Sequence, residues 1–349
     1  MSKHGYDPLY TVEDAQKVQP LFRPVDYGQP VDVDHCMTAV YHDAGHVFGS
    51  SMIALKARAC DDRKRTILFS GDVGRWHRPI LDDPTLVPYA DYVVIESTYG
   101  DRVHPREEDP VDKLAEVINA TAERGGNVVI PSFALERSQE LLYHISGLLN
   151  LKRIPQLPVF LDSPMAIRIT KVFEDSPEYF DREMSERIAQ HLSPFKFPGL
   201  TMTMTTDESK AINELRGPCV IIAGSGMCTG GRVKHHISHN IGRPESTILF
   251  VGYQAVGTLG RILVDGVDEV RIHGDMHPVA AEIDRIYGFS AHADREELTC
   301  WVSALKTTPK RVFVVHGETN AADNFAAYLA EQTGWDTHVP DYQERVELE

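Results

Sequence analysis

The sequence predicts an α/β protein built around a largely parallel sheet, and three observations lead to that class. Short apolar runs rich in β-branched residues recur along the chain, each followed by polar or small residues and then by a helical stretch. The 349 residues suffice for two domains, or for one domain that carries a large insertion. No repeat, low-complexity stretch or linker-like segment divides them. Two domains would therefore be intimately connected.

Six predicted strands end in polar residues or glycine. They cover 66–69 before Ser70-Gly71-Asp72, 92–95 before Glu96-Ser97-Thr98, 127–130 before Pro131-Ser132, 158–161 before Asp162-Ser163, 219–223 before Gly224-Ser225-Gly226, and 312–315 before His316-Gly317-Glu318. Loops at the carboxyl ends of such strands converge on one crevice, where ligands of open α/β folds bind. We therefore expect the functional residues at these ends.

Two helices are predicted between the strands. One begins at Asp109-Pro110, an N-cap followed by a first-turn proline, and closes at Gly125-Gly126. The other covers 135–149, with an apolar face made by Leu141, Leu142, Ile145, Leu148 and Leu149. We interpret these apolar positions as core.

Composition narrows the class of protein. A net charge of −16 argues against a broad basic surface that coats nucleic acid, so any such contact must be local. Five scattered cysteines without a CxxC pair argue against a disulfide framework or a zinc ribbon, and they are interpreted as reduced thiols. Neither a membrane-length apolar run nor a signal-peptide core is present, so a cytoplasmic location is the default expectation.

Three strand-end or loop residues are candidate metal ligands. His46 lies in a glycine-flanked loop, Asp72 follows a buried strand, and His316 ends an apolar strand before a helix. Taken singly, the loop histidine is weak evidence and Asp72 could be a turn or helix cap. Together they suit a divalent site in which Asp72 bridges two ions, and zinc is the expected metal.

The segment GSGMCTGGR is a candidate phosphate-binding loop. It follows a strand and precedes a helix, so its backbone N–H groups could cradle a phosphate, with Ser225, Gly226 and Arg232 nearby. A simple tight turn explains a glycine loop equally well in isolation. The histidines that follow are interpreted as surface or RNA-facing residues, because His235 and His239 share a helix face from which His236 points away.

The ordered motifs AGHVFGS, FSGD, ESTYGDR, GFSAHAD and VVHGE resemble the β-CASP group of metallo-β-lactamase-fold ribonucleases. The stretches PSFALERSQELL, FLDSPMA, GSGMCTGGR and GYQAVGTLGR are also similar to its bacterial and archaeal RNA-processing members. The resemblance covers nearly the whole chain from Tyr10 onward. It implies a metallo-β-lactamase αββα sandwich, in two pieces at 1–109 and 254–349, with a β-CASP domain of parallel sheet and flanking helices inserted at 110–253.

The resemblance also implies roles for individual residues. His46 would bind the first of two zinc ions, Asp72 would bridge both, and His316 would complete the second site. His292 would meet the scissile phosphate or protonate the leaving oxygen, with Glu96 orienting it. Arg137 and Arg261 would be secondary phosphate contacts. A histidine at position 316 favours RNA over DNA as substrate, and the resemblance allows a homodimer.

One departure from the family concerns the metal ligands. The motif HxHxDH, which supplies four ligands in metallo-β-lactamase enzymes, occurs nowhere in this sequence. We expect the leading strands to be absent and each ion to keep one histidine plus shared Asp72, too few for a normal pair. Either Met1 is an internal methionine of a longer active enzyme, which we favour, or this is a genuine short form without metal chemistry.

The sequence thus predicts a metal-dependent RNA phosphodiesterase, acting as an endo- or exonuclease. The alternative is a non-catalytic RNA-binding or scaffold paralogue. A small-molecule hydrolase of the same fold is a third class, which the long insertion disfavours.

Overall fold

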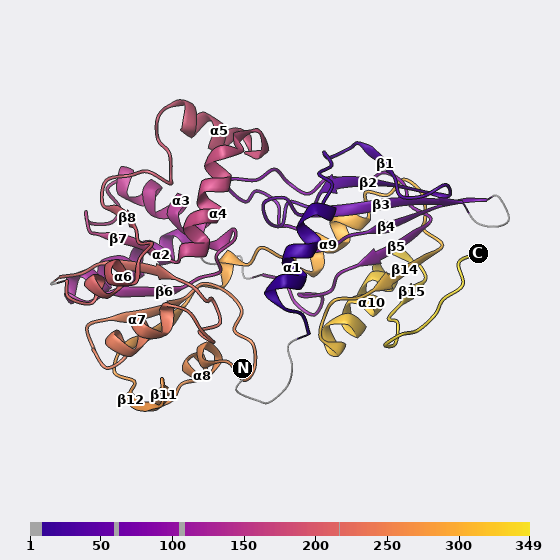
Figure 1. The fold of residues 1–349 in the computed structure, drawn as a ribbon. Coiled ribbons are helices and arrows are strands. Elements are labelled where there is room, and N and C mark those ends of the chain that lie inside the picture. The colour runs from indigo at the N-terminus through magenta and orange to yellow at the C-terminus, as the bar shows by residue number, and fades with distance from the viewer. Residues whose placement is uncertain (1–8, 59–62, 105–108, 216) are drawn as a thin grey trace.

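A computed structural model describes residues 9–58, 63–104, 109–215 and 217–349 of the chain. Two sheets with their helices lie side by side (Figure 1). The α/β class predicted from the sequence is confirmed: one sheet is mixed, and the other is parallel throughout and flanked by helices.

The mixed sheet is built from the two ends of the chain. Its order is β1-β2-β3-β4-β5-β14-β15, in which β1 to β4 pair antiparallel and β4, β5, β14 and β15 pair parallel. The strands are Pro30–Asp32, Met37–Asp43, Ser51–Arg58, Lys64–Phe69, Tyr92–Ile95, Arg311–Val314 and Thr337–His338. Helices α9 (Arg295–Val302) and α10 (Thr319–Thr333) pack on it, and Leu298, Trp301 and Phe325 share a core with Leu68 and Val93.

The parallel sheet has the order β13-β10-β6-β9-β7-β8. In chain order its strands are β6 (Val128–Pro131), β7 (Val159–Asp162), β8 (Leu200–Met202), β9 (Val220–Ala223), β10 (Thr247–Phe250) and β13 (Glu282–Arg285). Strands β11 (Glu269–Ile272) and β12 (Asp275–Pro278) form a separate antiparallel hairpin.

Side chains of the parallel strands alternate between two cores, as the two-residue period of a strand requires. Val220 and Ile222 of β9 face the core that contains α2 (Pro110–Glu123), α3 (Arg137–Asn150) and α4 (Pro164–Asp175). Ile221 and Ala223 face the opposite core, which contains α7 (Val233–Asn240) and α8 (Leu259–Asp265). The remaining helices are α1 (Val12–Val18), α5 (Arg182–Ala189), α6 (Thr206–Ile212) and the 3-10 turns Gln19–Leu21, Pro177–Tyr179 and Tyr287–Phe289.

Both predicted helices are present. Asp109 caps α2 by accepting the N–H of Val111, with Pro110 in the first turn and Gly125 at φ 74° beyond its end. The leucines and isoleucine predicted for the core face of α3 are all buried.

The predicted boundary of the inserted domain differs from the structure. Strand β13 pairs with β10, so the parallel sheet extends to Arg285 rather than ending at residue 253. The sequence of β13, Glu-Ile-Asp-Arg, alternates too weakly to stand out as a strand, because it lies at the exposed edge of the sheet.

The sequence predicted neither a disulfide framework nor a membrane-spanning segment, and two observations on the described part of the chain concern these predictions. Its four cysteines, Cys36, Cys219, Cys228 and Cys300, are free thiols, whereas Cys60 lies outside the described residues. None of the helices described is both long and apolar enough to cross a membrane.

Candidate functional site

The three candidate metal ligands meet at the end of the mixed sheet. His46 lies in the loop between β2 and β3, Asp72 follows β4, and His316 follows β14. Strands β4 and β14 both pair with β5, so the parallel topology brings their carboxyl ends together. His46 Nε2 is 3.8 Å from one Asp72 oxygen, and His316 Nδ1 is 3.0 Å from the other. Asp72 therefore lies between two imidazoles, one facing each carboxylate oxygen.

Tight turns hold the His46 loop. Gly45 has φ 60°, and a side chain there would meet the backbone nitrogen of Pro84 at 2.8 Å, so only glycine fits. The hydroxyl of Ser50 accepts the N–H groups of His46 and Val47, both at 3.2 Å. The sequence of this loop thus fixes where the imidazole of His46 emerges.

The pair predicted to act beside the metal is formed. His292 Nδ1 lies 3.2 Å from both carboxylate oxygens of Glu96. Glu96 is fully buried and also accepts the N–H groups of Val73, at 2.7 Å, and Thr98, at 3.3 Å. The His292 ring centroid lies 4.3 Å from that of His46 and 6.4 Å from that of His316. His292 therefore lies beside the three candidate ligands, and its Nδ1 contacts Glu96.

The environment sets different protonation states for these groups. Burial opposes the charged form of His292, but the hydrogen bond and the charge of Glu96 outweigh it and raise the pKa of His292. Burial also opposes the charged form of Glu96, yet His292 and the backbone donors lower the pKa of this carboxyl. Burial, followed by the proximity of His292, lowers the pKa of His46 to about 4. His46 is therefore neutral at pH 7, the state in which imidazole binds metals.

The donor set fits zinc. Two imidazoles and a carboxylate are ordinary zinc ligands. One ligand atom each from His46, Asp72 and His292, and likewise from Asp72, Glu96 and His316, lie within 4.8 Å of one another. The ring of His46 turns its Nε2 toward Asp72, which leaves Nδ1 on the side of the ring away from the shared carboxylate.

Sequence reasoning missed His104. Its ring is buried, and Nε2 lies 3.1 Å from the carbonyl oxygen of His292, which can only accept. Burial, with help from Arg75, lowers the pKa of His104 to about 4, so the neutral ring donates from Nε2. The backbone N–H of His104 is held by Asp294 at 2.9 Å. Its only sequence signal was its place in ESTYGDRVH, directly after a strand-end motif.

Two arginines predicted to contact phosphate form internal ion pairs, Arg137 in a buried position and Arg232 in a half-buried one. Arg137 pairs with Glu140 on α3 and has 7% of its surface exposed. Arg232 donates to Asp162 at 2.7 Å and to the carbonyls of Thr203 and Met204 at 2.9 and 2.8 Å. Their guanidinium groups already have internal partners, and phosphate contacts from these two arginines stay predictions.

The other predicted contacts differ in exposure, since Gly226 is buried and Ser225 is half-buried. Arg261 is 39% exposed at its side chain and pairs with Asp265 one helical turn further along α8. Ser225 and Gly226 lie in the loop after β9, where the Ser225 hydroxyl contacts Gly230. Their roles stay predictions.

The interpretation of the helix histidines was wrong for one residue. His236 is fully buried, and its Nε2 lies 2.6 Å from Asp162. This acidic partner is 74 positions away in the sequence, so the helix pattern alone gave no indication of burial. His235 does lie near the surface, stacked on His273 with ring centroids 4.3 Å apart.

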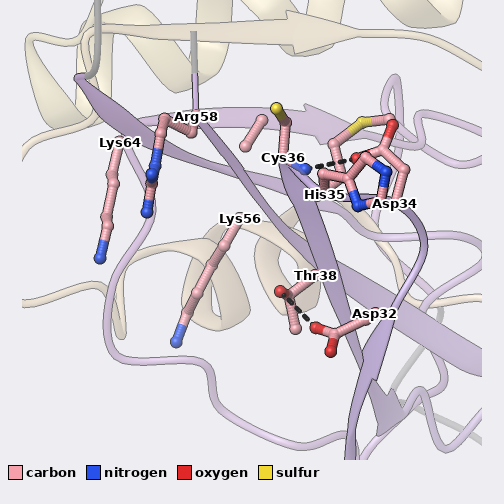
Figure 2. A pocket seen from close by; sticks show the side chains of 10 residues that line it. Asp32, Asp34, His35, Cys36, Thr38, Lys56, Arg58 and Lys64 are labelled. Carbon is pink, nitrogen blue, oxygen red and sulfur yellow. Dashed lines mark hydrogen bonds between the residues drawn. The ribbon is translucent and has the colours of Figure 1, made fainter.

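A cavity of about 520 Å³ lies elsewhere on the mixed sheet. Figure 2 shows Lys56, Arg58 and Lys64 extending from β3 and β4 on one side of it, with Asp32, Asp34 and His35 on the other. These residues lie at the start of β2 and the end of β3, whereas His46 follows the end of β2. The cavity is therefore at the opposite end of the strands from the candidate ligands.

The fold and the arrangement of the candidate ligands suit a metal-dependent hydrolase with an inserted parallel sheet, and comparisons with known proteins identify the family. Residues 138–263 match the Beta-Casp domain, and residues 276–340 match the Zn-dependent metallo-hydrolase RNA specificity domain. The chain is 37% identical over 312 residues to ribonuclease TTHA0252 of Thermus thermophilus, covering 89% of this chain and 70% of that protein. This chain belongs to the β-CASP metallo-β-lactamase ribonuclease family.

Archaeal relatives carry a different functional name. The transcription termination factor FttA of Methanocaldococcus jannaschii is 33% identical over 348 residues, and that of Methanosarcina mazei is 32% identical over 335 residues. The alignments cover 97% and 93% of this chain, but 54% and 52% of those proteins. The chain thus spans about half the length of these relatives.

Proposed function

We propose that this chain serves in zinc-dependent hydrolysis of RNA phosphodiester bonds. The observation that carries the proposal is the placement of Asp72 between His46 and His316, with the Glu96–His292 pair alongside. His46, Asp72 and His316 would hold the metal. Zinc, when bound, would neutralise charge that develops on the phosphate.

Residues of the chain would position the reacting groups and donate a proton. Glu96 accepts a hydrogen bond from His292 Nδ1–H, which fixes the ring and leaves Nε2 for the substrate side. The raised pKa of His292 favours the ring with a proton on Nε2 as well, and this proton would be donated to the leaving oxygen. Arg261, Ser225 and Gly226 are proposed to contact RNA phosphates. RNA as substrate is supported by the match to an RNA specificity domain.

The ligand count argues for weak metal binding by this chain alone. Zinc usually takes four ligands, and His46 and His316 supply one imidazole to each side of Asp72. Because the described ligands are few, we also consider a second candidate function, that of a non-catalytic RNA-binding or scaffold protein. A cytoplasmic location and a homodimer stay predictions.

Metal content and RNA cleavage of the purified chain test the proposal. We expect zinc, measured by calorimetry, to bind more weakly to Asp72→Asn than to the wild type, with unchanged binding for the exposed control Asp175→Asn. Cleavage of single-stranded RNA should require zinc and should fall at least a hundredfold in His292→Ala. RNA binding without zinc binding or cleavage would support the non-catalytic candidate. A chain that binds neither zinc nor RNA would refute both.

A further inference from the structure

Two exposed aromatic side chains lie on loops that contact the segments carrying His46 and His316. Phe133 follows β6 and is 48% exposed, and Tyr253 follows β10 and is 45% exposed. Strands β6 and β10 are neighbours in the parallel sheet, roughly 4.8 Å apart. The two rings therefore leave the same edge of the sheet on adjacent loops.

The loop of Phe133 reaches the His46 side of the site. Glu136, three residues further on, accepts the backbone N–H of Phe48 at 3.1 Å, two residues after His46. The Phe133 ring itself lies against the glycine-rich loop, because a side chain on Gly226 would meet its carbons at 3.0 Å. The loop of Phe133 is thus tied to the loop of His46, and the Phe133 ring lies against the backbone of Gly226.

Tyr253 reaches the His316 side. Its hydroxyl donates to Glu318 at 3.3 Å, and Glu318 follows His316 by two residues and precedes α10. Burial and then Glu318 raise the pKa of Tyr253, while Arg261 lies close enough to oppose that shift. The next residue, Gln254, donates to the carbonyl of Gly226 at 2.9 Å. The loops of both rings are therefore tied to the same glycine-rich segment.

We propose that Phe133 and Tyr253 form a nucleobase-stacking site for single-stranded RNA on either side of the cleavage position. This proposal deepens the proposed function and rests on it. Aromatic rings stack on any unpaired base, so such a site favours unpaired over duplex RNA and tolerates sequence. Arg261 is half-buried, lies near Tyr253 and pairs with Asp265, and it supplies positive charge for the adjoining phosphate. Fixed rings lose little conformational freedom on binding.

Binding of a labelled RNA tests the stacking directly and needs no catalysis. The probe is a single-stranded RNA of seven nucleotides, with 2-aminopurine at the centre and uridine at the other positions. The fluorescence of 2-aminopurine falls when it stacks, and the probe is titrated with the full chain. We expect Phe133→Ala and Tyr253→Ala each to weaken binding roughly five- to tenfold and to reduce quenching. Tyr253→Phe, which keeps the ring, should stay within about twofold of the wild type.

Matched variants separate stacking from loss of structure. Phe133→Leu keeps apolar volume without a ring and should behave like Phe133→Ala, while Tyr342→Ala removes a ring that is 93% exposed elsewhere and should bind normally. If the wild type binds RNA and the ring variants match it in affinity and quenching, the stacking site is refuted and the proposed function stands. If the wild type binds no RNA, both fail. Unchanged RNA affinity with an altered oligomeric state would assign the rings to a protein interface and overturn the proposal.

Discussion

Asp162 is a buried carboxylate surrounded by hydrogen-bond donors. It accepts from Thr203 and Ser209, both at 2.5 Å, from Arg232 at 2.7 Å, and pairs with His236 at 2.6 Å. Burial alone would raise the pKa of Asp162, but His236 and the other donors outweigh it and hold that pKa well below its usual value. A buried charge satisfied so fully fixes the segments that carry its partners.

Asp162→Asn should destabilise the protein by about 2–4 kcal/mol, because Arg232 and His236 lose a buried charged partner. Since the folded pKa of Asp162 is depressed, its contribution is present above the unfolded value of about 3.9 and is lost as pH falls further. Urea unfolding at several pH values should therefore show a gap between wild type and variant that is largest above about pH 5 and shrinks toward pH 3. A gap that grows on acidification would contradict this linkage.

His104 should matter through the hydrogen bond that it donates to the carbonyl of His292. His104→Phe fills the space without a donor, whereas His104→Gln retains a donor near the place of Nε2. We expect the phenylalanine variant to lose about 1–2 kcal/mol more stability than the glutamine variant. The imidazole resonances of His292 should shift in His104→Phe and stay near wild type in His104→Gln. Equal behaviour of both variants would mean that His104 contributes packing alone.

At the scale of elements, the glycine-rich loop after β9 offers a matched pair of positions. Gly231 has φ 76°, and a side chain there would meet the carbonyl oxygen of Gly224 at 2.3 Å. Its neighbour Gly230 has nothing within 4 Å of the same added atom. Closure of this loop therefore depends on glycine at one position and not at the other.

Gly231→Ala should lower the free energy of unfolding by at least about 2 kcal/mol. The backbone at this position is left-handed, and the added side chain would clash with Gly224 and displace it. Because the loop carries Ser225 and Gly226, RNA affinity should also fall. Gly230→Ala should alter neither quantity beyond error. Urea unfolding and RNA anisotropy on the two variants measure both effects, and a Gly231→Ala variant as stable as Gly230→Ala would rule out the strained loop.

Elements and strand ends were predictable from the sequence because their signals are local. Apolar runs followed by Asp72 or His316 located the converging loops, and parallel topology then placed these side chains together. Residues whose roles depend on distant partners were not predictable. Arg232 pairs with Asp162 70 positions away, and His104 contacts His292 188 positions away. A single sequence carries no signal for such distant pairings. The pair of Arg137 with Glu140, three positions apart on α3, has a spacing that is visible in the sequence.

At the scale of the whole molecule, a buried charge cluster joins the two sheets. Arg78 lies between β4 and β5, and it pairs with Glu140 of α3, which also pairs with Arg137. Arg78 further donates to the carbonyl of Gly288, at the return from the parallel sheet to the mixed sheet, at 3.0 Å. Glu140 is thus a buried carboxylate that contacts Arg137 of its own helix and Arg78 across the junction.

Glu140→Gln should remove the buried carboxylate that both guanidinium groups contact, leaving them the more distant charge of Glu136, and should cost about 3–5 kcal/mol. Because the lost interaction spans the junction, we also expect the two sheets to unfold in separate steps, with denaturation curves from fluorescence and circular dichroism that no longer coincide. The exposed pair of Arg182 and Glu186 on α5 provides the control, since Glu186→Gln should leave the midpoint and the coincidence of the curves unchanged. Coincident curves for Glu140→Gln with a wild-type midpoint would show that apolar packing, and not this cluster, couples the two halves.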